Sequence, residues 1–316
     1  MVLSMNEPFS RRLTKAILAK QSVLVAGLDP NIANLPPDLC SRWFHQGGET
    51  FAAAAECILE FNKGLIEALS DVVVAVKPQL AFYECLGAPG MSALSQTISY
   101  AKQHSLLVII DGKRNDIGSS MVGYADAYLG TTQVGGTRLA AFPADALTVN
   151  PYLGSDSIAP LVERAQLSGT GVFVLVKTSN PSGSEIQNLA VVDKKVYEIV
   201  GEHCHRWGLA SRDSDGYSAV GAVVGATYPR EAAALRKIMP HAYFLVPGFG
   251  AQGAGPADVV ASFNADGLGA VVNSSRDIIF AFAKQGGSYQ DAARGAAIHS
   301  RDIINKALLE GGKRAW

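Results

Sequence analysis

The stretch SLLVIIDGKRNDIGSS, residues 105–120, joins an apolar run to four charged side chains. Its first half is a continuous series of Leu, Val and Ile, which is typical of a strand covered on both faces of a parallel sheet. Asp111, Lys113, Arg114 and Asp116 follow directly. Because charges at the end of a buried strand are costly to desolvate, this arrangement favours a functional strand end over a purely structural ion pair.

Seven further segments share this apolar composition, and stretches that could be helical separate them. Alternation of strands and helices predicts right-handed crossovers, and eight units are the number that closes a (β/α)8 or TIM barrel. An open doubly wound sheet is the alternative. The seven strand segments are residues 22–30, 72–78, 146–152, 171–182, 219–227, 243–250 and 268–275, and the clearest helical ones are residues 51–70, 192–207, 230–239 and 257–263.

The length of 316 residues suits one such barrel, so we expect a single domain over residues 1–316. A basic segment, FSRRLTKAILAKQ, precedes the first strand at residues 9–21. Transit peptides can have this composition, but Phe9, Leu13, Ile17 and Leu18 fall on one helical face. We therefore expect a packed N-terminal helix at about residues 9–20.

Composition excludes several classes of protein. The 27 Lys and Arg nearly cancel the 28 Asp and Glu, so there is no sign of a face that attracts nucleic acid or a membrane. No segment reaches the roughly 18–20 apolar residues of a membrane helix. We expect a cytoplasmic protein with no nucleic-acid or membrane partner and with reduced thiols, because no CxxC pair joins its four cysteines, Cys40, Cys57, Cys85 and Cys204.

Polar residues cluster just after the predicted strands. A barrel collects its active site at the carboxyl ends of its strands, so this one-sided distribution is what a catalytic barrel would show. Asp111 and Lys113 are two residues apart and would point to the same face of a regular strand. The residues in question are Asp29, Lys77, Asp111, Lys113, Asn150, Ser179, Thr227, Gln252 and Arg276.

Lys77 ends an earlier strand, so a row that alternates ammonium and carboxylate groups is plausible. Asp116 could reach the same lysine or another subunit's copy of the site. Carboxylates on either side of Lys113 would favour its ammonium form, which can act as an acid.

The glycine-rich stretch GFGAQG, residues 248–253, fits the GxGxxG pattern of dinucleotide-binding folds. That fold also needs an acidic residue at the end of the next strand, whereas here the next strand ends at Asn273. In barrels, the loops after the seventh and eighth strands commonly hold a phosphate group. Gln252 and Arg276 lie in these two loops, so we expect a phosphate site.

These motifs together resemble the orotidine 5'-phosphate decarboxylase superfamily, and their form is similar to its longer bacterial branch. DGKRNDIGSS matches the family's Asp-x-Lys-x-x-Asp signature, and the resemblance extends from about residue 22 to about residue 285. The other matching motifs, in order, are GLDP at 27–30, VKPQLAFYE at 76–84, VKTSNPSG at 176–183, VPGFGAQG at 246–253 and NSSRDI at 273–278.

The resemblance implies a homodimeric barrel that decarboxylates orotidine 5'-monophosphate to UMP in de novo pyrimidine biosynthesis, with no metal and no organic cofactor. It implies that Lys113 delivers a proton to C6 of the pyrimidine and that Asp111 sits against the substrate carboxylate. Lys77 would extend the charged row. Asp116 would come from the partner subunit, with Ser120 beside it on the same segment.

The resemblance also implies which residues bind the substrate. Asp29 and Lys77 would bind the ribose hydroxyls, and Ser179 would contact the amide edge of the pyrimidine. Relatives often have Thr where this chain has Ser120, and the hydroxyl is retained. The expected substrate-binding set is Asp29, Ser120, Ser179, Pro247, Gly248, Gln252, Ser275 and Arg276.

Two alternatives remain open at this point. Sugar-phosphate relatives, such as hexulose-phosphate synthase or ketogulonate-phosphate decarboxylase, share the core signature but bind Mg²⁺ through an acidic residue at the second strand end. This chain has Lys77 there, and an ammonium group would repel Mg²⁺. A non-catalytic phosphate-binding barrel would keep Arg276 and the glycine loop but would not need Asp111, Lys113 and Asp116 together.

Overall fold

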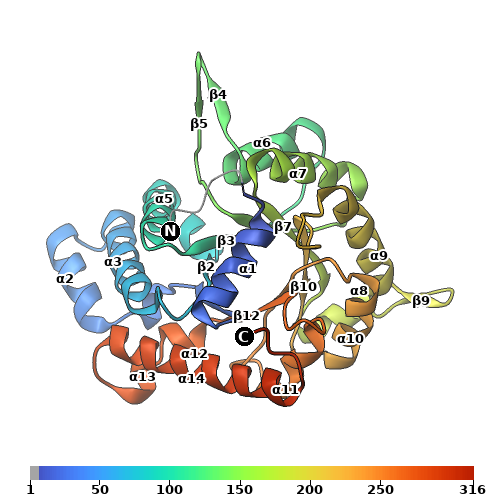
Figure 1. Ribbon diagram of the computed structural model, residues 1–316. Helices are drawn as coiled ribbons and strands as arrows, with labels where there is room; N and C mark the ends of the chain where they lie inside the picture. Colours follow the sequence, from blue (N-terminus) through green and yellow to red (C-terminus); the bar gives the residue numbers. More distant parts are fainter. Residues whose placement is uncertain (1–6) are drawn as a thin grey trace.

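The computed structural model describes residues 7–316 as a closed barrel of eight parallel strands in the order β1-β12-β11-β10-β7-β6-β3-β2 (Figure 1). This confirms the predicted TIM barrel and excludes the open sheet, because β1 pairs with both β2 and β12. The strands are β1 Leu24–Leu28, β2 Ala75–Pro78, β3 Leu107–Arg114, β6 Ala146–Val149, β7 Gly171–Lys177, β10 Val220–Val224, β11 Phe244–Val246 and β12 Ala270–Ser274.

Residues 1–6 lie outside the described residues, as does the part of the single-domain prediction that covers them, and the single domain stays a prediction. Among the described helices, none is long and apolar enough to cross a membrane.

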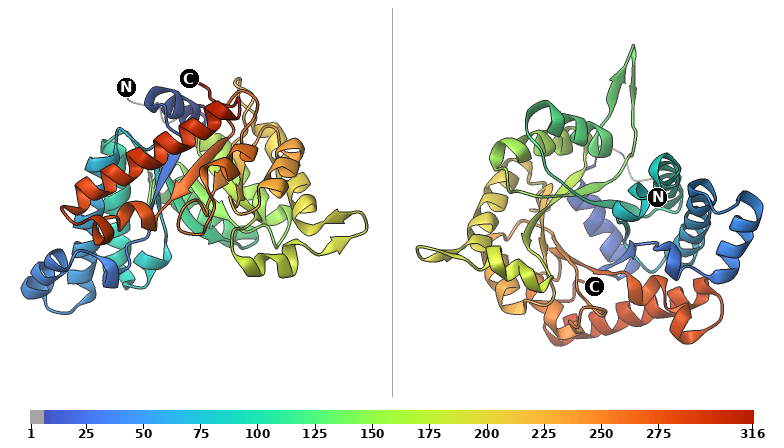
Figure 2. Two further views of the ribbon diagram at one scale, coloured as in Figure 1. Left: turned by 90° about the horizontal axis from the view of Figure 1, so that it is seen from below. Right: turned by 180° about the vertical axis from the view of Figure 1, so that it is seen from behind.

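Helices surround the barrel on its outside (Figure 2). Side-chain caps define where two of these helices begin. The Thr50 side chain accepts a hydrogen bond from the Ala53 N–H at the start of α3, and Ser288 does the same for Asp291 in α14. The helices are α2 Pro37–Gly47, α3 Phe51–Leu69, α4 Ala81–Glu84, α5 Gly87–Gln103, α6 Gly118–Leu129, α7 Ser155–Ser168, α8 Ser184–Gln187, α9 Val196–Gly208, α10 Pro229–Ile238, α11 Pro256–Val259, α12 Arg276–Ile279, α13 Phe282–Gln285 and α14 Tyr289–Glu310.

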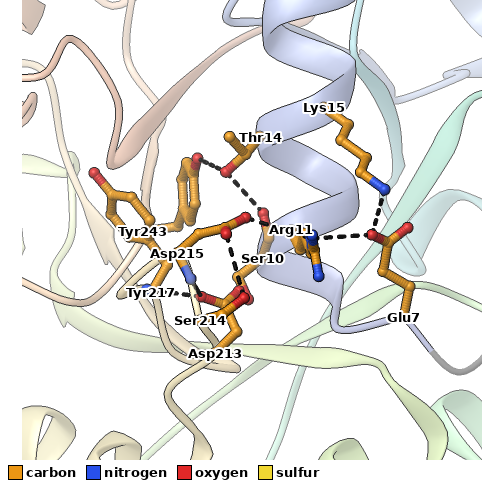
Figure 3. A network of polar contacts seen from close by, with 10 residues as sticks. All are labelled: Glu7, Ser10, Arg11, Thr14, Lys15, Asp213, Ser214, Asp215, Tyr217 and Tyr243. Atoms are coloured by element: carbon orange, nitrogen blue, oxygen red, sulfur yellow. Dashed lines mark hydrogen bonds and ion pairs between the residues drawn. The ribbon is translucent and has the colours of Figure 1, made fainter.

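Helix α1, Phe9–Lys20, lies against the amino ends of the strands. Phe9, Leu13 and Ile17 are buried, but Leu18 is 42% exposed, so its predicted place on the buried face is wrong. A polar network fixes the helix to the loop before β10 (Figure 3). In it, the Ser10 hydroxyl donates to Asp213 at 2.6 Å, and the hydroxyls of Thr14 and Tyr243 lie 2.6 Å apart.

A buried ion pair completes the closure of this end. The Arg12 guanidinium donates to the Asp145 carboxylate and, at 2.9 Å, to the Gly169 carbonyl. The other oxygen of Asp145 accepts from the Val108 N–H at 2.8 Å. Asp145 immediately precedes β6, and Gly169 lies two residues before β7, so Arg12 joins α1 directly to the amino end of the barrel.

Two hairpins that the sequence analysis did not predict project from the barrel (Figure 1). One pairs β4 Thr132–Val134 with β5 Thr137–Leu139 through Gly135 and Gly136, a dipeptide that favours tight hairpin turns. The other pairs β8 Ala190–Val191 with β9 Lys194–Lys195. The helix predicted over residues 192–207 therefore begins only at Val196.

Candidate active site

A cavity of about 510 Å³ opens at the carboxyl ends of the strands. Ten of the twelve predicted site residues line it, whereas Asp116 and Ser120 do not. Asn150 and Thr227, also noted at strand ends, are absent from its wall. The ten are Asp29, Lys77, Asp111, Lys113, Ser179, Pro247, Gly248, Gln252, Ser275 and Arg276.

An ionic cluster forms one part of the wall. The Asp111 carboxylate accepts from Lys77 Nζ at 2.8 Å through one oxygen and from Lys113 Nζ at 2.6 Å through the other. Lys77 comes from β2, and Asp111 and Lys113 come from the neighbouring β3, so strand pairing brings the three groups together. The contact between Asp111 and Lys113 is the one that their spacing predicts.

Burial and charge act in opposite directions on these groups. Burial alone would raise the pKa of Asp111, but the ammonium groups of Lys77 and Lys113 lower that pKa well below its ordinary value. Burial would lower the pKa of Lys77, yet the carboxylates of Asp111 and Asp29 raise it above its ordinary value. Asp111 and Lys77 are therefore both charged at neutral pH.

Sequence reasoning missed two further partners of Asp111. Gln79 Nε2 donates to Oδ2 at 3.0 Å, and the Thr148 hydroxyl donates to Oδ1 at 2.8 Å. With the two lysines, the carboxylate accepts four hydrogen bonds, which hold it in one orientation. A weak signal was present, because Thr148 is the polar residue in the otherwise apolar strand ALTV.

Two buried oxygen atoms in the cavity wall have no donor among the described residues. They are Asp29 Oδ1, just after β1, and Asn273 Oδ1, on β12. A buried acceptor without a partner costs about 1–3 kcal/mol. These positions therefore suit a bound molecule that brings hydroxyl or N–H donors. Asn273 was not predicted as a site residue.

The glycine loop after β11 and the start of α12 form another part of the wall. Gly248, Gly250 and Gly253 have φ values of +98°, +74° and +94°, which favour glycine over other residues. Within the described part of the chain, Asp277 pairs with Lys284 at 3.4 Å rather than with Arg276. The exposed Arg276 guanidinium is thus available to an anion in the cavity, as the expected phosphate site requires.

Asp116 lies on the loop before α6, and its carboxylate accepts from the Ile117 N–H at 2.8 Å. It makes no hydrogen bond or ion pair with Lys113 of its own chain within the described residues. Ser120, in the first turn of α6, is exposed. Asp116 and Ser120 therefore both lie outside the cavity of their own chain. That they serve a partner subunit's site stays a prediction.

Comparison with known proteins identifies relatives of this architecture. The family described as Orotidine 5'-phosphate decarboxylase / HUMPS matches residues 45–285. The chain is 46% identical to the orotidine 5'-phosphate decarboxylase of Rhodopirellula baltica, over 94% of this chain and 98% of that protein. It is 42% identical to that of Caldicellulosiruptor bescii, over 95% and 99%.

Solved structures agree with this relationship. A putative orotidine-monophosphate-decarboxylase from Toxoplasma gondii is 30% identical, with a TM-score of 0.79 and coverage of 98% of this chain and 99% of that one. A putative orotidine 5'-phosphate decarboxylase from Streptomyces avermitilis is 34% identical, with a TM-score of 0.76 and 98% coverage of both chains. The chain therefore belongs to the Orotidine 5'-phosphate decarboxylase / HUMPS family.

Proposed function

We propose that this chain decarboxylates orotidine 5'-monophosphate to UMP in pyrimidine biosynthesis, without a metal or an organic cofactor. The single observation that carries the proposal is the ionic cluster. It places an ammonium group, Lys113 Nζ, 2.6 Å from a buried carboxylate at the mouth of a barrel whose opposite loops suit a phosphate. Membership of the decarboxylase family supports it.

The chemical difficulty of the reaction lies at C6 of the pyrimidine. When the bond from C6 to the carboxyl group breaks and CO₂ leaves, the electron pair stays on C6, and the ring offers no ordinary electron sink. The Lys113 ammonium would stabilise this charge and then donate its proton to C6. Asp111 would lie against the substrate carboxylate and keep Lys113 in place through the ion pair.

Binding energy would come from groups remote from C6. Asp29 and Lys77 would bind the ribose hydroxyls, which supply donors for the unpartnered Asp29 oxygen. Ser179 would contact the amide edge of the pyrimidine. Contacts made far from the reacting carbon can support closure of the site and exclusion of water. The phosphate and adjoining groups would meet Pro247, Gly248, Gln252, Ser275 and Arg276.

We also propose a homodimer in which Asp116 and Ser120 enter the partner's site. Support comes from exposed apolar side chains beside Asp116, on α6 and on the loop before α7. A hydrogen bond of 3.1 Å from the Ser157 hydroxyl to Asn115 joins the loop before α6 to the start of α7, so the two segments are neighbours. Apolar side chains gathered beside a site are typical of an interface. The exposed apolar side chains beside Asp116 are Ile117, Val122, Tyr152 and Leu153.

A cytoplasmic location is the last part of this proposal. All four cysteines are free thiols. The cytoplasm keeps thiols reduced, whereas oxidising compartments favour disulfides. The free thiols are therefore compatible with the cytoplasm.

The two other candidate functions receive less support from the site. The Lys77 ammonium, in contact with Asp111 at 2.8 Å, occupies the place where a magnesium-dependent relative would need an acidic ligand. A barrel that only bound phosphate would gain nothing from burying Lys77 and Asp111 at the opposite part of the wall. Decarboxylation uses both parts.

The direct test is loss of the absorbance of orotidine 5'-monophosphate on mixing with EDTA-treated protein, with UMP identified as the product. We expect full turnover, unchanged when Mg²⁺ is restored. A folded protein that leaves this substrate intact would contradict the proposal. Turnover of this substrate that depends on added Mg²⁺ would contradict the part of the proposal that excludes a metal.

A further inference from the structure

We propose that Thr148 is a positioning residue that holds Lys113 in the backbone conformation needed for proton transfer. This inference rests on the proposed decarboxylation and deepens it. Thr148 lies on β6, its exposed fraction is only 1%, and its single hydroxyl contacts both Asp111 and Lys113 of β3. It accepts from the Lys113 backbone N–H at 3.0 Å and donates to Asp111 Oδ1 at 2.8 Å.

The backbone of Lys113 is in an unfavourable conformation. Its φ is +49°, in the left-handed region that costs a non-glycine residue about 1–2 kcal/mol. Such a conformation persists only where neighbouring groups impose it, and it is concentrated at functional sites. Lys113 is the proposed proton donor, so the contacts that impose this φ deserve a functional test.

Strand pairing shows why Thr148 is suited to impose the left-handed conformation of Lys113. Ile110 pairs with Leu147, and Arg114 pairs with Val149, so three residues of β3 form a bulge opposite one residue of β6. That one residue is Thr148. Bulges redirect side chains beside active sites, and here the bulge carries Asp111 and Lys113. The Thr148 hydroxyl supplies the acceptor that the Lys113 N–H needs in place of a carbonyl of the regular ladder.

The hydrogen bonds form a closed chain. The Lys113 N–H donates to Thr148, the Thr148 hydroxyl donates to Asp111 Oδ1, and the same oxygen accepts from Lys113 Nζ at 2.6 Å. Because the hydroxyl has only one hydrogen, its donation to Asp111 leaves its lone pairs for Lys113. The position of the ammonium group relative to its own backbone therefore depends on this hydroxyl.

The test compares Thr148→Val, which keeps the volume and removes the hydroxyl, with Thr148→Ser, which keeps the hydroxyl. The readouts are kcat, KM and the exchange of the C6 hydrogen of UMP in deuterated water, which reports proton transfer between C6 and Lys113. We expect Thr148→Val to lower kcat and exchange in parallel by about 30- to 100-fold, with KM within about threefold, because small misplacements of a reacting group have effects of this size. Thr148→Ser should restore kcat to within about fivefold of the wild type.

Thr170→Val is the matched control. Thr170 is also buried, and its hydroxyl donates to the Leu129 carbonyl at 3.3 Å near the amino end of β7, away from the cavity. It should leave kcat and exchange unchanged. If Thr148→Val does not fold, Thr148→Ala takes its place with the same expectations.

Three results would overturn the inference in an active wild type. They are a Thr148→Val kcat within about threefold of the wild type, a rise in KM without a fall in kcat, and no rescue by Thr148→Ser. Failure of the wild type itself to decarboxylate orotidine 5'-monophosphate would instead contradict the proposed function, so the two failures are distinguishable.

Discussion

The two ends of the barrel each contain a buried aspartate paired with cations, but the pairs differ in what surrounds them. At the amino end, the side chains of Arg12, on α1, and Asp145 are 7% and 3% exposed. At the carboxyl end, Asp111 is similarly buried, while the side chain of Lys113 is 47% exposed to the cavity. The Arg12 guanidinium is thus shielded from solvent at one end, whereas the Lys113 ammonium is accessible at the other.

Hydrogen-bonding capacity separates the ends further. Both carboxylate oxygens of Asp145 have partners within the chain, and Arg12 also reaches the Gly169 carbonyl. The cavity at the other end keeps two buried oxygens, of Asp29 and Asn273, without donors among the described residues. Burial of charge alone therefore does not identify an active site. An exposed cation with unused acceptors beside it distinguishes the candidate site at the carboxyl end from the ion pair at the amino end.

The largest expected effect is on turnover, and it tests whether the site at the carboxyl end of the barrel needs a residue from a second chain. Lys113→Ala and Asp116→Ala should each lower turnover at least about 1000-fold as homodimers. In a heterodimer, two-fold symmetry puts both defects in one site and leaves the other site intact. Equal mixing gives about half heterodimers, so activity should recover to roughly a quarter of the wild type per site.

The measurement is activity against mixing ratio, after mass spectrometry has shown that subunits exchange. Two Lys113→Ala preparations mixed with each other serve as the control and should stay inactive. Exchange without recovery would place Asp116 in its own chain's site or outside any site, and the open end would then be complete within one chain.

A smaller effect tests whether the cavity accepts a phosphate. Arg276→Ala should raise KM for orotidine 5'-monophosphate about 100-fold, because charge-assisted hydrogen bonds to the phosphate are lost. On orotidine, which lacks the phosphate, the change should stay below about threefold. Lys284→Ala is the control, since this neighbouring cation pairs with Asp277 and does not line the cavity.

Equal losses on both substrates would show that Arg276 supports the fold rather than the phosphate. Equal effects of Arg276→Ala and Lys284→Ala would point to a general loss of positive charge at the open end.

The eight strands of the barrel and the polar residues that follow them were predictable from the sequence, because continuous apolar runs and strand-end motifs are local signals. The bulge in β3 was not. The regular spacing predicted the contact of Asp111 with Lys113, but the structure reaches it through a left-handed residue and a shifted register. Thr148 and Gln79 were missed because their roles depend on strands that are distant in the sequence and meet only in the closed barrel.

The amino end shows the same limit. The apolar positions of α1 predicted a packed helix, yet Leu18 is exposed because it lies outside the buried face that contains Phe9, Leu13 and Ile17. The pairing of Arg12 with Asp145 joins residues far apart in the sequence, and no local pattern indicates it.

We expect that the pair of Arg12 and Asp145 supports the fold and that the pair of Lys113 and Asp111 performs the chemistry. The most direct test is to measure kcat and the free energy of unfolding in urea for Arg12→Met and Lys113→Met, which remove one cation from each pair and keep an apolar stem. Arg12→Met should lower the free energy of unfolding by about 3 kcal/mol, since Asp145 loses its buried partner, and should keep at least about a third of kcat. Lys113→Met should change stability by less than about 1 kcal/mol and lower kcat at least about 1000-fold. A Lys113→Met kcat within tenfold of the wild type, or folded Arg12→Met protein as inactive as Lys113→Met, would contradict the claim.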